Sequence, residues 1–233
     1  MNAGPDVETY EDLAATAEGY IKKIAALRVS KVDYASEGLK MADARSLRLF
    51  QNGLAWRSEE LARSALHLMN TGESIAALCL MRAMTETAAA CWYVNVTMTE
   101  QINNIDPADE AHLKTLRLVM GAKAWDDVPQ AVNVLTFLKH AEKTFPGIEK
   151  NYALMSEFAH PNWAGTMALY SRRDEPTSTI FERGARTTGE RTNGMHVFLA
   201  SLTLFLAAQE EITKQRTDFN AACELAPHAV PAE

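Results

Sequence analysis

The stretch that decides the fold is Ser74–Val96, which reads SIAALCLMRAMTETAAACWYVNV. Only two of its side chains, Arg82 and Glu86, are charged, and all the others are apolar or small and polar. A helix without a polar face has to be covered by other elements on nearly every side. The stretch therefore predicts a central helix that is buried almost all round.

The two charged side chains of this helix are four residues apart, so they lie side by side on one face. Burying one charge without a partner costs several kcal/mol, so each charge needs a partner. Two interpretations remain open. In the structural one, Arg82 and Glu86 pair with each other and with backbone groups or helix ends. In the functional one, Arg82 reaches into a polar pocket shared with His160, and Glu86 orients it.

Helical periodicity continues on both sides of the central stretch. Asn70-Thr71-Gly72 supplies a left-handed cap and a tight corner, so the helices before and after it should fold back against each other. The fold class is therefore all-α, an antiparallel bundle of about seven helices. Helices are predicted at 6–28, 41–70, 73–96, 107–120, 129–145, 148–160 and 193–220.

The pattern changes between the last two predicted helices. Residues 166–171 and 178–182 are short runs rich in Thr, Tyr, Ile and Phe, and Arg172–Pro176 separates them. This arrangement predicts a small β-hairpin or an extended loop. We expect residues 1–225 to form a single domain and residues 226–233, with two prolines, to form a disordered tail. The start of the helix at 107 is expected to be capped by Asp106.

Composition restricts the function classes. Hydrophobic residues make up 47% of the chain and charged residues 23%, which is the profile of a globular protein. The net charge of −7 argues against wholesale binding to nucleic acid or acidic membranes. Residues 1–10 lack the layout of a signal peptide, and the apolar run 195–208 is too short to span a bilayer. We expect a cytoplasmic protein that does not act at a membrane.

The three cysteines point to the same compartment. Cys79 and Cys91 are twelve residues apart in one predicted helix, about 18 Å along its axis, so they cannot bridge each other. With Cys223, we expect reduced thiols. No Cys-x-x-Cys pair or His/Cys spacing typical of zinc occurs. We therefore predict neither a cofactor nor a resident metal.

A second informative stretch, Tyr152–Asn162, reads YALMSEFAHPN. Pro161 disfavours helical backbone at the residue before it, so the helix should end near His160. Its apolar side chains are placed to face the core; these are Leu154, Met155 and Phe158.

The polar side chains Ser156, Glu157 and His160 fall together on another part of this helix. A polar group at a helix end is a candidate site. The structural alternative is that His160 caps the last carbonyl groups, because a helix C-terminus favours positive charge.

These motifs carry a family resemblance. An Arg-x-x-x-Glu in an apolar helix after a helical hairpin, followed by Ser-Glu-x-x-His-Pro at a later helix end, resembles a poorly characterised family of bacterial all-helical proteins. That family is similar to the HEPN superfamily (higher eukaryotes and prokaryotes nucleotide-binding). The similarity covers roughly residues 45–210. It implies a compact helical bundle, often a dimer, and in many members a metal-independent ribonuclease of a toxin or antiviral defence system.

The HEPN signature is an arginine followed after roughly four to six residues by a histidine, often Arg-Asn-x-x-x-His, at a helix end near the dimer axis. The resemblance implies that the arginine stabilises phosphate charge while the histidine acts as acid or base. His160 matches the histidine, but Met155 and Ser156 stand where Arg and Asn are expected. Arg82 would then supply the guanidinium from a neighbouring helix. A second match is Arg191-Thr-Asn-Gly-Met-His196.

Two main functions remain open. The first is a homodimeric HEPN-like ribonuclease or RNA-binding protein with RNA as its ligand. Its candidate catalytic residues are Arg82, Glu86, Ser156, Glu157, His160, Arg191 and His196.

The second is a non-catalytic helical module, in which these residues make structural contacts and the function is dimerisation or binding of a partner protein. The acidic balance and the missing Arg-Asn pair favour it. A third hypothesis is a divalent metal site built from Glu86, Glu157 and His160, since carboxylates with imidazole suit several such ions.

Overall fold

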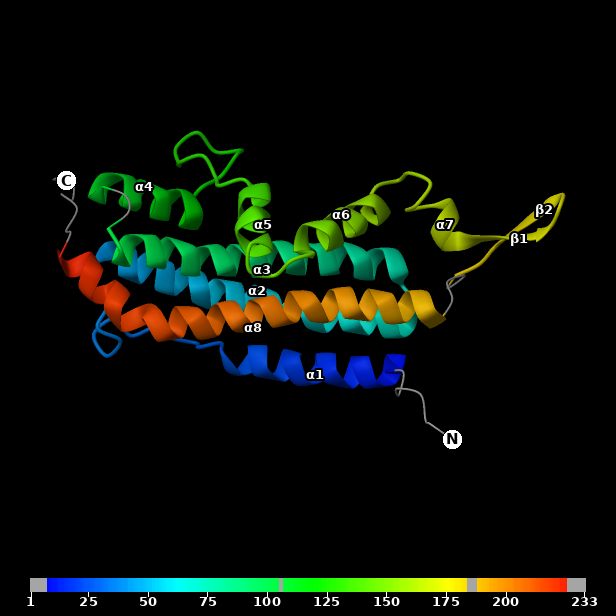
Figure 1. The fold of residues 1–233 in the computed structure, drawn as a ribbon, viewed down its shortest axis with the longest axis horizontal. Coiled ribbons are helices and arrows are strands. Elements are labelled where there is room, and N and C mark those ends of the chain that lie inside the picture. The colour runs from blue at the N-terminus through cyan, green and yellow to red at the C-terminus, as the bar shows by residue number, and fades with distance from the viewer. Residues whose placement is uncertain (1–7, 105–106, 184–187, 226–233) are drawn as a thin grey trace.

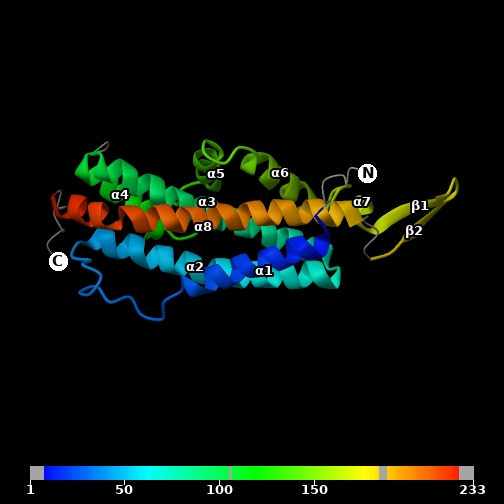
Figure 2. The same cartoon turned by 60° about the horizontal axis from the view of Figure 1, so that its bottom comes forward.

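The computed structural model describes residues 8–104, 107–183 and 188–225, and within them it is an all-α bundle with one small hairpin. Four long helices, α1, α2, α3 and α8, run side by side along the molecule (Figure 1; Figure 2). The shorter helices α4, α5 and α6 cover α3 on the side away from α1 (Figure 1). The helices are α1 (Tyr10–Ala26), α2 (Ala42–Thr71), α3 (Ser74–Ile102), α4 (Ala108–Val119), α5 (Val134–Glu142), α6 (Ile148–Ala159), α7 (Met167–Tyr170) and α8 (Thr188–Leu225), and the strands are β1 (Ser171–Glu175) and β2 (Ser178–Phe181).

The predicted central helix is α3. Its most extensive contact is with α8, and α2, α5 and α6 cover other parts of its surface. The run Ala88–Val94 is buried without a break, which is the burial that a helix with no polar face requires. The small side chains of Ala88, Ala89 and Ala90 let neighbouring helices approach the backbone of α3 closely.

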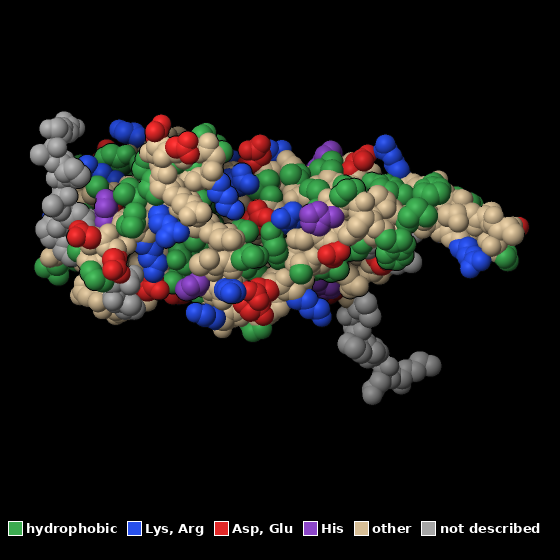
Figure 3. All heavy atoms as spheres, turned by 90° about the horizontal axis from the view of Figure 1, so that it is seen from above, with side chains coloured by type: hydrophobic (Ala, Val, Ile, Leu, Met, Phe, Trp, Pro, Cys, Tyr) green, Lys and Arg blue, Asp and Glu red, His purple; other side chains and the backbone are tan. Residues whose placement is uncertain are grey.

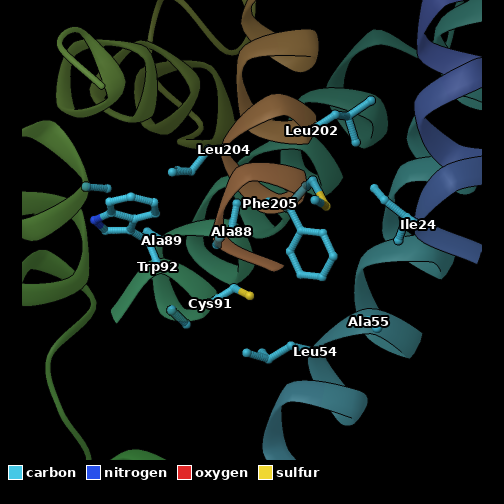
Figure 4. Packing of buried hydrophobic residues seen from close by; sticks show 14 of the residues in the cluster. Ile24, Leu54, Ala55, Ala88, Ala89, Cys91, Trp92, Leu202, Leu204 and Phe205 are labelled. Carbon is cyan, nitrogen blue, oxygen red and sulfur yellow. The ribbon is translucent and has the colours of Figure 1, made fainter. Parts of the chain in front are cut away.

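One apolar core connects the helices of the bundle. Phe205 of α8 lies among Ala88 of α3, Leu54 of α2 and Ile24 of α1 (Figure 4). Burying a large side chain of this kind contributes about 1.5–3 kcal/mol to the free energy of folding. On the opposite side of α3, the rings of Trp92 and Phe145 meet edge to face with centroids 5.0 Å apart.

Helix ends follow the local signals in the sequence. Gly72 ends α2 in the left-handed conformation, with φ 81°, and the chain reverses into α3. This confirms the corner predicted from Asn70-Thr71-Gly72. The predicted cap Asp106 and the predicted tail 226–233 lie outside the described residues.

The hairpin is confirmed, but the residues in its first strand differ from the prediction. Residues 167–170 form the short helix α7, and the charged segment Ser171–Glu175 is strand β1. The strands pair antiparallel with Arg172 opposite Ile180, and Arg172 Nε donates to Glu182 Oε1 at 2.7 Å. Because the hairpin projects from the bundle (Figure 1), its strands need no apolar face.

One helix of the described part passes a test of length and composition for crossing a membrane. It is the segment Gly189–Leu225, whose most apolar 18-residue window has a mean hydropathy of 1.2. Half of that window is buried inside the bundle, where α8 packs along α3.

A polar connection crosses the core between α2 and α8. Gln51 Nε2 donates to Gln209 Oε1 at 2.7 Å, and Gln209 Nε2 donates to Cys91 Sγ at 3.4 Å. Arg216 Nη2 in turn donates to Gln51 Oε1 at 3.2 Å. Burial raises the pKa of the Cys91 thiol, so this group stays neutral. Because buried amides need partners, these contacts fix the position of α8 along α2 and α3.

Replacing Gln209 with leucine tests this connection. Gln209→Leu leaves the buried amide of Gln51 and the Cys91 sulfur without their partner, so we expect the free energy of unfolding to fall by about 1–3 kcal/mol. Urea denaturation followed by circular dichroism measures the change. The matched control is Gln130→Leu, at an exposed position between α4 and α5. Equal stability of the two variants would contradict the structural role.

Candidate functional site

Arg82 and Glu86 of α3 meet Tyr152 of α6. Arg82 Nη2 donates to the Tyr152 hydroxyl oxygen at 2.8 Å, and this hydroxyl donates to Glu86 Oε1 at 2.9 Å. Arg82 Nε lies 3.4 Å from Glu86 Oε1, and the guanidinium carbon lies 5.1 Å from the centroid of the Tyr152 ring. We call these three side chains the Arg82–Tyr152–Glu86 network. It joins α3 to α6 through one shared phenol.

The network lies at the edge of the bundle. The side chains of Arg82 and Glu86 each keep 32% of their surface exposed, so the expectation that α3 buries both charges away from water is wrong. The reason is that α6 covers this face of α3 only partly. The hydrogen bond to Tyr152 raises the pKa of Arg82, against the opposing effect of partial burial. Each charge thus keeps part of its surface exposed, while Arg82 Nε is buried beside Glu86, and the phenol fixes the relative position of the two side chains.

The helix α6 ends at Ala159, as Pro161 predicts, and His160 follows with extended backbone (φ −83°, ψ 147°). The His160 N–H donates to Ser156 O at 3.2 Å, but the imidazole is exposed and makes no hydrogen bond within the described residues. The imidazole therefore does not cap the helix. His160 stands eight positions after Tyr152, which is about 12 Å along the helix axis. The chain thus does not bring His160 to Arg82.

The other polar residues of the stretch make local contacts. Ser156 Oγ donates to Tyr152 O at 2.8 Å, and Glu157 Oε2 accepts from Asn162 Nδ2 at 2.8 Å. Ser156, Glu157 and His160 are thus close in sequence, but each has its own surroundings.

The turn after His160 is tightly constrained by Gly165. A Cβ added at Gly165 would lie 2.0 Å from His160 O and 2.6 Å from Phe158 O, and both of these atoms belong to the backbone. Asn162 Oδ1 accepts from Gly165 N at 3.0 Å. The chain therefore folds back directly over the end of α6, and the exposed imidazole sits on a fixed turn.

The apolar side of α6 differs from the prediction at one residue. Met155 is buried and Phe158 is half-buried, but Leu154 is 50% exposed, so its expected place in the core is wrong. The helix packs on the bundle through Ile148 and Met155, which are seven residues apart on one face. Leu154 is turned about 100° away from that face.

The second motif match, Arg191 and His196, does not form a pair in the structure. The Arg191 guanidinium carbon lies 4.4 Å from the centroid of the Tyr10 ring, and Nη2 donates to Met69 O at 3.5 Å. His196 is exposed. Five residues turn a helix by about 140° beyond a full turn, so the two side chains leave α8 on different sides. Their spacing in the sequence does not bring them together in one chain.

The hypothesis of a metal site finds no donor cluster in the described residues. There, no three side chains among His, Cys, Asp and Glu come close enough to hold an ion. Glu86 lies at the network and Glu157 contacts Asn162, so these two carboxylates serve different parts of α3 and α6.

Tyr152 is the site residue that the sequence reasoning missed. It stands four residues before Ser156 and eight before His160. The i, i+4 spacing that puts Ser156 and His160 on one face of the helix therefore puts Tyr152 on the same face. A phenol in that position could have been recognised as a partner for a charged pair.

The substitution Tyr152→Phe tests the network. It removes the hydroxyl that accepts from Arg82 and donates to Glu86. We expect the free energy of unfolding to fall by about 0.5–1 kcal/mol, a modest loss because the two charged side chains are partly exposed to water and can be solvated again. Chemical denaturation measures it, with Tyr34→Phe, at an exposed position between α1 and α2, as the control. A Tyr152→Phe variant as stable as the control would show that the hydroxyl contributes nothing.

In comparisons with known proteins, no family model, no curated protein and no solved structure matches this chain. The resemblance to HEPN proteins therefore stays a prediction from the motifs.

Proposed function

We propose that the protein is a non-catalytic helical module that pairs with a second copy of itself. The proposal rests on an exposed apolar area, which we call the end surface. It consists of Trp163, Met167, Tyr170 and Phe181, whose exposed fractions are 73%, 40%, 37% and 63%. Figure 3 shows hydrophobic side chains gathered in this region, at the base of the hairpin. The largest contiguous apolar patch on a soluble protein is often an interaction site.

The members of the end surface are neighbours in space. Trp163 and Met167 line one surface hollow beside the hairpin. Glu182 N donates to Tyr170 O at 2.8 Å, which places Phe181 next to α7. A patch of this kind can pack against its own copy about a two-fold axis, which is the commonest symmetry of homo-oligomers. The dimer implied by the family resemblance also supports a second copy as the partner.

The separation of the candidate catalytic residues supports a non-catalytic role. A ribonuclease site of the expected type needs a guanidinium and an imidazole around one phosphate. Arg82 is engaged with Tyr152, about two helical turns from His160, and Arg191 and His196 leave α8 on different sides. Neither pair of residues converges within one chain.

One observation favours a second candidate, the HEPN-like ribonuclease or RNA-binding protein of a defence or toxin system. The exposed His160 is three residues before Trp163, on the turn that Gly165 fixes. Pairing through the end surface would bring two imidazoles close to the two-fold axis, where the family signature expects its histidine. The guanidinium would then come from the second chain.

Weakening the end surface tests the main proposal. We expect the wild-type protein to sediment as a dimer and the double variant Trp163→Ser/Phe181→Ser to sediment as a monomer, because the variant loses apolar area that pairing would bury. The control is Trp125→Ser, since Trp125 is 70% exposed but lies in the connection between α4 and α5. A wild-type monomer, or a double variant that stays dimeric, would refute the proposal.

A cleavage assay separates the two candidates. Labelled single-stranded RNA is incubated with the purified protein in the presence of a chelator, and the products are separated on a gel. If the protein is non-catalytic, the RNA stays intact with both the wild type and His160→Ala. Cleavage by the wild type that is lost in His160→Ala, but kept in His196→Ala, would favour the ribonuclease instead.

A further inference from the structure

A cavity of about 480 Å³ lies at one end of the bundle, where α2 ends, α3 begins, α8 begins and α6 passes over them. Volumes of about 300–1,000 Å³ are typical of sites for small molecules. Most of the surface of the cavity is apolar. Its main apolar side chains are Met69, Leu78, Met81, Leu154, Phe158 and Val197.

This cavity explains why Leu154 and Phe158 lie outside the core. They are four residues apart on α6, and both line it rather than filling the core. Leu154 is thus half exposed because it forms part of the wall of an open cavity. On the facing side, Leu78 and Met81 of α3 supply the opposite wall. An aliphatic body placed between these walls would exchange water contacts for apolar ones.

The mouth of the cavity has a positive side chain. Arg191 lines it, and stacking on Tyr10 holds its guanidinium in place. An arginine has five N–H donors, and the contact with Met69 O uses one of them. Glu190 also lines the cavity but is engaged in an interaction of its own.

The first turn of α3 adds to the positive potential. Its N-cap residue, Glu73, makes no side-chain hydrogen bond to the helix, and its carboxylate instead accepts from Arg183 Nη1 at 2.7 Å. Ser74, the first residue of this 29-residue helix, lines the cavity. The N-terminal end of a long helix favours a negative group. The apolar walls thus suit the hydrocarbon part of a ligand, and the polar mouth suits its negatively charged part.

We propose that this cavity binds a small amphipathic monocarboxylate, with its hydrocarbon chain between Leu154, Phe158 and Met81 and its carboxylate at Arg191. The site is separate from the Arg82–Tyr152–Glu86 network and from the end surface. It does not depend on whether the chain dimerises or acts on RNA.

Filling the cavity tests the apolar part of the site. Decanoate binding is measured by calorimetry for the wild type and for Gly194→Leu. Gly194 lines the cavity, and a Cβ there would lie 3.6 Å from Met69 Cε, which is ordinary contact, so α8 accepts a side chain at this position. We expect the variant to bind decanoate about tenfold more weakly or worse, and to melt no lower than the wild type, since leucine favours helix over glycine.

The matched control is Gly53→Leu. Gly53 is also a helical glycine, on an exposed face of α2, and a Cβ there would meet nothing within 4 Å. This variant should bind decanoate like the wild type. Absence of decanoate binding to the wild type, or equal affinity of the Gly194→Leu and Gly53→Leu variants, would overturn the proposal.

Changing the charge tests the polar part of the site. Arg191→Gln keeps a hydrogen-bond donor but removes the positive charge, so decanoate affinity should fall several-fold while decanol affinity stays the same. For the wild type, decanoate should bind more tightly than decanol. Equal affinity of the wild type for the acid and the alcohol would overturn the assignment of a carboxylate at Arg191.

Discussion

The structure depends on the need to cover α3 on nearly every side. A helix whose surface is apolar or small has no face to offer to water, so α2, α5, α6 and α8 have to pack around it. The alanine run Ala88–Ala90 permits short distances between backbones, and Phe205 of α8 fills the space that remains (Figure 4). The polar chain of Gln51, Gln209 and Cys91 then fixes one position of the helices along each other.

The same constraint explains where polar groups and open space occur in the bundle. Where α6 covers α3 incompletely, the two charges of α3 reach water, and Tyr152 links them to the covering helix. Where α2 turns into α3, the covering helices leave a cavity with apolar walls and an arginine at its mouth. Both features occur where the neighbouring helices leave part of α3 uncovered. The exposed His160 belongs to a third region, the turn that follows α6.

Much of the fold could be predicted from the sequence because its signals are local. The apolar pattern of Ser74–Val96, the glycine at the end of α2 and the proline after His160 each act within one or two helical turns. The rotation of α6 about its own axis could not be predicted in this way. It depends on the faces that α3 offers, and it places Met155 inside and Leu154 at the cavity. The separation of Arg82 from His160 could not be predicted either. It depends on how far α6 is shifted along α3, and a sequence motif contains no information about that shift.

The length of α8 has a consequence for any assembly of this chain. A helix of 38 residues is about 57 Å long, so the bundle is a rod with the apolar end surface near one tip. Two rods that meet by their tips form a particle of roughly double length with little added width. Such a particle has a high frictional coefficient for its mass. The small interface at its centre has to resist the bending torque from both rods.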